Sequence, residues 1–145
     1  MKGFVAFLAF VLAASLASMP ARSAAPPAIR VHIDISSQTM SVALQGSPVA
    51  HWKVSTGAKG FRTPRGHFRP HVLRRMHYSS KYENAPMPHS IFFHYGYAIH
   101  GTQHVRSLGR PASHGCVRLA PQNAARLYAL VKRYGMRATR ITITN

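Results

Sequence analysis

The stretch Ala112-Ser113-His114-Gly115-Cys116-Val117-Arg118-Leu119 holds the only cysteine of the 145-residue sequence. Small and polar residues precede the thiol, which favours an exposed loop or strand end over a packed core. His114 lies two residues before Cys116 and Arg118 two residues after it, and neighbouring cations lower the pKa of a thiol. Gly115 lets the adjoining backbone approach a ligand closely. The stretch predicts a reactive cysteine, with a small inert core residue as the alternative.

A histidine upstream supplies a candidate base. His100 stands in Tyr97-Ala98-Ile99-His100-Gly101, 16 positions before Cys116. A cysteine nucleophile needs a base within hydrogen-bonding reach, and folding brings the two residues together. Backbone N–H groups of Gly115 and Cys116 are expected to bind the oxyanion of a tetrahedral intermediate.

These residues resemble a known family signature. His100-Gly101 and the stretch from Ser113 to Leu119 are similar to the L,D-transpeptidase catalytic domain of the YkuD type. The likeness extends to Val54-Ser55-Thr56-Gly57 and Thr63-Pro64-Arg65-Gly66-His67-Phe68, and covers about residues 29–143. It implies a mainly β fold: a sandwich of mixed sheets with one main helix and a long cleft-lining loop.

The resemblance implies acyl transfer through a thioester on Cys116. The thiol would attack the L-centre carbonyl of diaminopimelate in a peptidoglycan tetrapeptide stem and release D-alanine. An amine of a second stem would then take the acyl group and form a 3→3 cross-link. Transfer to water, or attachment of wall stems to another protein, are the alternative outcomes. Carbapenems are expected to acylate the same thiol, and no cofactor or metal is expected.

The partner that orients His100 is expected to be uncharged. Asp34 and Glu83 are the only acids in the chain, and neither is an obvious member of a triad. In the family this group is often a backbone carbonyl or a serine beside the catalytic histidine, which here matches Gly101. The resemblance therefore implies a catalytic set of Cys116, His100, Gly101 and Gly115.

Three neighbours of the thiol are assigned to substrate binding. Arg118 is expected to hold a substrate carboxylate with its planar fork, and pairing with loop carbonyls is the alternative. His114 either supports the cleft or is a hydrogen-bonded loop residue. Ser113 is expected to contact substrate or brace the turn, and His104 falls in a loop that could line the cleft.

The first 25 residues are typical of a secretory signal peptide. A positive start, an apolar run over residues 4–17 and a small-residue region follow one another. The apolar run is shorter than the roughly 20 residues of a spanning helix, and an uncleaved N-terminal anchor is the alternative. Ser15-Leu16-Ala17 and Ser23-Ala24-Ala25 both fit the small-residue rule, so the cleavage site stays open. Residues 26–145 are then a single catalytic domain, with the periplasm or cell wall as the expected location.

The charge is strongly basic, with 19 Lys and Arg against 2 acids and a net charge of +17. Such a field favours a polyanionic environment. In a secreted protein we expect cell-wall or outer-membrane polymers rather than nucleic acid. Two rival functions remain: a zinc site formed by His100, His114 and Cys116, and a non-enzymatic basic protein that binds wall polymer, lipopolysaccharide or DNA.

Alternating apolar and polar residues predict most of the strands. One helix is expected over 121–134, with Pro121 at its first position and Gly135 at its end. Residues 74–84 have no clear period and are expected to form the long cleft-lining loop. The expected strands cover residues 29–35, 40–44, 49–55, 67–72, 91–94, 97–100 and 139–144.

Overall fold

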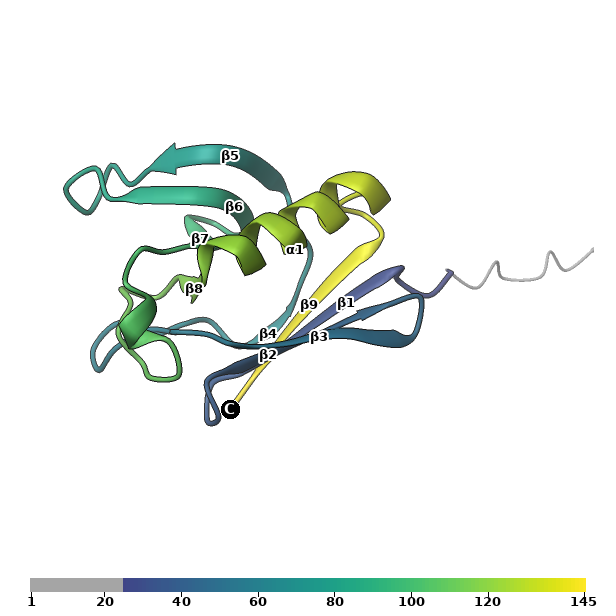
Figure 1. Cartoon of the computed structure of the whole chain (residues 1–145), viewed down its shortest axis with the longest axis horizontal. Helices are drawn as coiled ribbons and strands as arrows, with labels where there is room; N and C mark the ends of the chain where they lie inside the picture. The colour runs from purple at the N-terminus through teal and green to yellow at the C-terminus, as the bar shows by residue number, and fades with distance from the viewer. Residues whose placement is uncertain (1–24) are drawn as a thin grey trace, which may run out of the picture.

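The computed structural model describes residues 25–145, so nearly all of the predicted signal peptide lies outside the described residues. The described chain forms two mixed sheets and one main helix, as the sequence predicts (Figure 1). None of its helices is long and apolar enough to cross a membrane. The elements are β1 Ile29–Asp34, β2 Thr39–Leu44, β3 Ser47–Lys53, β4 Gly66–Phe68, β5 Val72–Tyr78, β6 Pro86–His94, β7 Tyr97–Gly101, η1 Val105–Ser107, β8 Val117–Leu119, α1 Pro121–Tyr134 and β9 Thr139–Thr144.

The first sheet has five strands in the order β3-β2-β1-β9-β4. The meander β1-β2-β3 is antiparallel, whereas β9 returns from the far end of the chain and pairs with β1 in parallel. In β1 the apolar residues Ile29, Val31 and Ile33 are buried and alternate with Arg30 and His32, which are exposed. The sheet therefore has one apolar inner face and one polar outer face.

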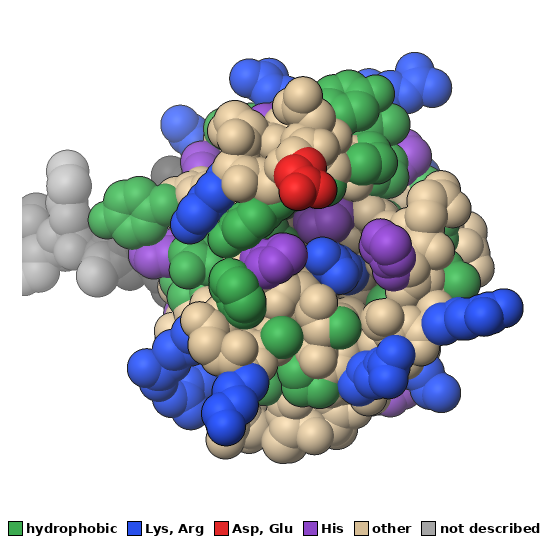
Figure 2. Space-filling model, turned by 90° about the vertical axis from the view of Figure 1, so that its left-hand side faces the viewer, with side chains coloured by type: hydrophobic (Ala, Val, Ile, Leu, Met, Phe, Trp, Pro, Cys, Tyr) green, Lys and Arg blue, Asp and Glu red, His purple; other side chains and the backbone are tan. Residues whose placement is uncertain are grey.

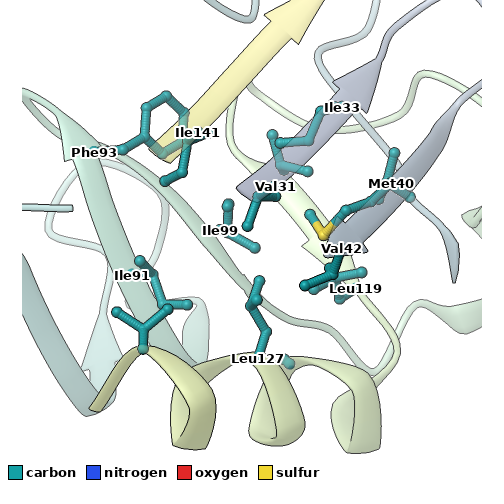
Figure 3. Close-up of a cluster of buried hydrophobic side chains, with 14 of the residues drawn as sticks. Val31, Ile33, Met40, Val42, Ile91, Phe93, Ile99, Leu119, Leu127 and Ile141 are labelled. Carbon is teal, nitrogen blue, oxygen red and sulfur yellow. The ribbon is translucent and has the colours of Figure 1, made fainter. Parts of the chain in front are cut away.

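The second sheet has four strands in the order β5-β6-β7-β8. Helix α1 packs against β6 and β7 and buries Ala124, Leu127 and Val131. Gly135 ends the helix with φ +96°, a conformation that favours glycine. Side chains from both sheets and from α1 meet in a single core (Figure 3).

The strand predicted over 67–72 is wrong in extent. Strand β4 ends at Phe68 and pairs with β9 in the first sheet, whereas β5 begins at Val72 and pairs with β6 in the second. Residues 69–71 carry the chain from one sheet to the other. The alternation of side chains gives no sign of this change of partner.

The long loop predicted over 74–84 is also shorter than expected. Residues 74–78 belong to β5, and only residues 79–85 connect β5 to β6. Strand β5 lies at the edge of its sheet, and most of its residues are at least partly exposed, so it shows no regular apolar alternation. Pro86 and Pro88 fit within β6 because β7 pairs with it only from Ile91 onward.

Candidate active site

Residues 112–119, called here the nucleophile segment, are held by residues 55 and 56. The Ser55 amide donates to the Arg118 carbonyl at 3.0 Å, and the Arg118 amide donates back at 2.9 Å. The Ser113 amide donates to the Thr56 carbonyl at 2.9 Å. These bonds fix one side of the segment, and its end continues as β8 into the second sheet.

Two buried hydroxyls shape the turn before the thiol. Ser113 donates to the Cys116 carbonyl at 2.6 Å and accepts from the Gly115 amide at 3.0 Å. Thr63 donates to the Gly115 carbonyl at 2.8 Å and accepts from the Gly57 amide at 2.9 Å. Because the Gly115 amide already has a partner, the Cys116 amide is the remaining donor of the pair expected to bind an oxyanion.

Cys116 lies just before β8 and is partly exposed. The Ala98 amide donates to its Sγ at 3.4 Å. Burial raises the pKa of the Cys116 thiol, and the Ala98 amide and the Arg118 charge oppose this effect without overcoming it. Arg118 lowers the thiol pKa, as the sequence predicts for a neighbouring cation, but desolvation is the larger effect and the net change of the pKa is upward. A protonated thiol at neutral pH needs a base to become a nucleophile.

His100 is buried in β7 and is a suitable base. Its Nδ1 lies 2.7 Å from the Gly101 carbonyl oxygen. A carbonyl only accepts hydrogen bonds, so Nδ1 carries the proton and Nε2 keeps its lone pair. Burial lowers the pKa of His100 to about 4, partly offset by the Gly101 bond and reinforced by Arg118 and His77. The imidazole is therefore neutral at pH 7 and able to accept a proton.

Cys116 and His100 line the same cavity, whose volume is about 810 Å³. This size is typical of sites that bind small ligands or peptide segments. Figure 2 shows the loop end of the molecule, where the surface is hollowed and histidine and basic side chains gather. Other charged or titratable residues that line the cavity are His77, Lys81, Tyr82, Glu83, His104, His114 and Arg118.

Arg118 makes the contact with a loop carbonyl that was the alternative to substrate binding, and it also lines the cavity. Its guanidinium donates to the Ala112 carbonyl at 3.3 Å, so it braces the nucleophile segment. The same half-buried side chain lines the cavity beside Cys116. One contact with the backbone leaves other donors of the fork available for a carboxylate.

His114 connects the nucleophile segment to two loops. Its ring stacks on Tyr82 with centroids 4.2 Å apart and meets the edge of Phe61 at 4.5 Å.

Within residues 25–145, no three His, Cys, Asp or Glu side chains gather as metal ligands. The proposed zinc set of His100, His114 and Cys116 is therefore not assembled.

Other residues of the site escaped the sequence analysis. Thr63 belongs to a stretch that resembles the family, but only the fold reveals its bonds to Gly57 and Gly115. His77 lines the cavity from β5 and meets the ring of Phe92 edge-on at 5.1 Å. His77 falls within residues 74–84, which the sequence predicts to line the cleft, but no signal singled out this histidine or its place on a strand.

Comparisons with known proteins identify the family and the fold of this chain. The family model described as L,D-transpeptidase catalytic domain matches residues 28–143. A crystal structure of an L,D-transpeptidase from Xylanimonas cellulosilytica is 33% identical, with a TM-score of 0.65, and the match covers 86% of this chain and 63% of that one. An L,D-transpeptidase from Stackebrandtia nassauensis is 25% identical, with a TM-score of 0.71, over 91% of this chain and 60% of that one.

A third structure, an L,D-transpeptidase in complex with imipenem, is 23% identical and shares the fold, with a TM-score of 0.73 over 81% of this chain and 59% of that one. No curated protein matches the sequence significantly. The chain spans roughly three-fifths of the length of the solved structures that it resembles. Because the family model matches most of the sequence, the chain belongs to the L,D-transpeptidase catalytic domain family.

Proposed function

We propose that this chain is a peptidoglycan L,D-transpeptidase, an acyltransferase that uses Cys116 as its nucleophile. The observation that carries the proposal is the bond from His100 Nδ1 to the Gly101 carbonyl. It leaves a neutral Nε2 as a base in the cavity that also contains the thiol. Family membership supports the same reaction class.

The first half-reaction loads the enzyme. His100 Nε2 takes the thiol proton as Sγ bonds to the L-centre carbonyl carbon of diaminopimelate in a tetrapeptide stem. The Cys116 amide binds the oxyanion. Collapse of the intermediate breaks the amide C–N bond, and His100 returns the proton to the departing D-alanine amine. A thioester on Cys116 remains.

The second half-reaction transfers the acyl group. A neutral side-chain amine of another stem attacks the thioester and passes a proton to His100. The C–S bond breaks, the sulfur regains its proton, and a 3→3 cross-link forms. Water in place of the amine would make the enzyme an L,D-carboxypeptidase, and an amine of another protein would attach wall stems to it.

The cavity is suited to acidic stems. Arg118, Lys81 and several histidines line it, and Glu83 is the one acid among the lining residues. Opposite charge steers anionic substrates into such a cleft. We assign Arg118 to a substrate carboxylate, His114 to the cleft wall and Ser113 to the support of the oxyanion turn. The signal pattern of residues 1–25 favours action in the periplasm or cell wall.

Product analysis tests this proposal. The purified protein is incubated with tetrapeptide stems, and the products are separated and identified by mass spectrometry. We expect a 3→3 linked dimer with loss of D-alanine, and no turnover with Cys116→Ala. A tripeptide product alone would favour the carboxypeptidase. Full turnover by folded Cys116→Ala would contradict the proposal.

A non-enzymatic basic protein is the second candidate, and the extreme charge favours it. It predicts that Cys116→Ala leaves every wall phenotype unchanged. The same substitution therefore separates the two functions.

Because a related enzyme was solved with imipenem, we also propose that carbapenems acylate Cys116.

A further inference from the structure

The outer face of the five-stranded sheet carries an unbroken polar row that the proposed reaction does not use. The row crosses every strand of the sheet: each of its residues is paired in register with the next one. From β3 to β4 it consists of His51, Ser41, His32, Thr142 and His67. All three histidines are exposed. Figure 1 shows this sheet with α1 on its other side.

Each imidazole of the row is held by one hydroxyl. His51 Nδ1 lies 3.0 Å from Ser41 Oγ, His32 Nε2 lies 2.9 Å from Thr144 Oγ1, and His67 Nδ1 lies 3.1 Å from Thr142 Oγ1. Hydroxyls both donate and accept, so each contact persists whether the ring is neutral or protonated. Within residues 25–145 the second nitrogen of each ring makes no hydrogen bond.

Two arginines lie beside the histidine row. Arg30 of β1 is paired in register with Arg140 of β9. This pair lies two residues before the pair of His32 and Thr142 in the row, and so on the same face of the sheet. Like charges that face each other on neighbouring strands destabilise a sheet. The acid of this face, Asp34, is engaged by Ser36 and Ser37 and does not pair with either arginine. A bound anion would relieve the repulsion.

The shape of this face favours a chain-like ligand. A shallow hollow of about 550 Å³ lies over β3, β2, β1 and β9 and is lined by Arg30, His32, His51, Arg140 and Thr142, among others, whereas His67 lies outside it. Strands lie about 4.8 Å apart, so the three histidines repeat about every 10 Å. The large apolar side chains that the described chain exposes lie elsewhere, at Phe61, Met76, Tyr78, Tyr95 and Val105. The apolar residues that line the hollow, such as Ala43, Pro48 and Ala50, are small, so a membrane would find no large exposed apolar side chain to anchor it here.

We propose that the outer face of the five-stranded sheet binds a linear polyanion, and that it does so more tightly as the pH falls below neutrality. Histidine is the side chain whose charge ordinarily changes closest to neutral pH. The fixed charges on the face are Arg30, Arg140 and Lys53 against Asp34. Protonation of His32, His51 and His67 would add up to three positive charges in a row.

Fluorescence anisotropy with labelled long-chain inorganic polyphosphate tests the proposal, at pH 7.5 and 5.5 in the same salt. We expect about tenfold tighter binding at the lower pH, because affinity for a polyanion grows steeply with the number of charges that neutralise it. His32→Gln/His51→Gln/His67→Gln should abolish the pH difference. Arg30→Gln/Arg140→Gln should weaken binding at both pH values.

The exposed pair Arg74 and Arg75 of β5 provides the control. Arg74→Gln/Arg75→Gln removes the same charge from the other sheet and should retain the pH difference and most of the affinity. Thermal unfolding of each variant confirms folding independently of any transpeptidase activity. Poly-glutamate as a second probe distinguishes general charge recognition from phosphate recognition, and binding of either polymer with the expected variant effects supports the proposal.

Three results would overturn it: equal affinity of the wild type at the two pH values, a pH difference that survives in the triple histidine variant, or binding to anionic lipid vesicles without binding to either polymer. None of these results depends on whether Cys116 is catalytic.

Discussion

At the scale of single residues, Gly115 determines how the backbone reaches the thiol. Its φ is +115°, and a Cβ there would lie 2.7 Å from Cε1 of Tyr97 and 3.3 Å from the Arg62 carbonyl oxygen. Backbone strain and steric conflict would therefore both destabilise any other residue at this position. The position explains why the family-like sequence has glycine immediately before the cysteine.

We predict that Gly115→Ala disrupts the site. The forced φ alone costs roughly 1–3 kcal/mol, and the contact with Tyr97 displaces the turn that carries Cys116. Stability should fall by at least this amount in denaturant unfolding, and acylation should be lost. Gly96→Ala is the matched control, because Gly96 also lines the cavity and has open space for a Cβ. Equal effects of the two substitutions would contradict this account.

The burial of His100 predicts an unusual pH profile. A base must be unprotonated to act, so activity falls as the pH drops through its pKa. Burial lowers the pKa of His100 to about 4. We expect kcat/KM to hold through pH 6 and to fall to half only near pH 4, with folding checked by circular dichroism at each pH. An acid limb near pH 6.5 would show that the working imidazole is exposed to water.

At the scale of elements, the site depends on loops that lie outside the regular strands. Thr63 joins two of them through its bonds to Gly57 and Gly115. Gln38, which is 3% exposed, joins its turn to Thr56 by a bond from Nε2 to Oγ1 and another from the Thr56 amide to Oε1. These polar contacts position the segments around the thiol, together with the packing of Val54 and Val117 in the core.

We predict that Thr63→Val weakens both folding and catalysis. The substitution keeps the shape of the side chain but leaves the Gly57 amide and the Gly115 carbonyl without their partner. Each buried polar group that loses its hydrogen bond costs about 1–3 kcal/mol of folding free energy. Thr144→Val, at an exposed hydroxyl, should change stability by less than about 0.5 kcal/mol. Urea unfolding and acylation rates measure both effects. A neutral Thr63→Val would show that this bond does not support the nucleophile segment.

The elements that the sequence predicted well are those with a regular burial pattern. Helix α1 and strand β9 both have the predicted bounds. Strand β5 was missed because its residues are mostly exposed at a sheet edge. The crossing from β4 to β5 was missed because alternation does not identify the partner strand.

At the scale of the whole molecule, the two sheets serve different purposes. The second sheet places His100 on β7 and Cys116 immediately before the parallel strand β8. The first sheet contributes its inner face to the shared core and, in our proposal, its outer face to a polyanion. The sequence predicted the residues Cys116, His100 and Gly101. It did not predict the raised thiol pKa, because desolvation arises from packing by distant segments.

The measurement that tests the central claim most directly is the intact mass of the protein after brief exposure to a tetrapeptide stem. Cys116 is the only cysteine in the chain, so a thioester can form at one position. We predict an adduct with the mass of the stem less D-alanine, mapped to Cys116, and a severely slowed adduct in His100→Gln. An adduct that forms at the wild-type rate in His100→Gln, or maps to another residue, would contradict the account.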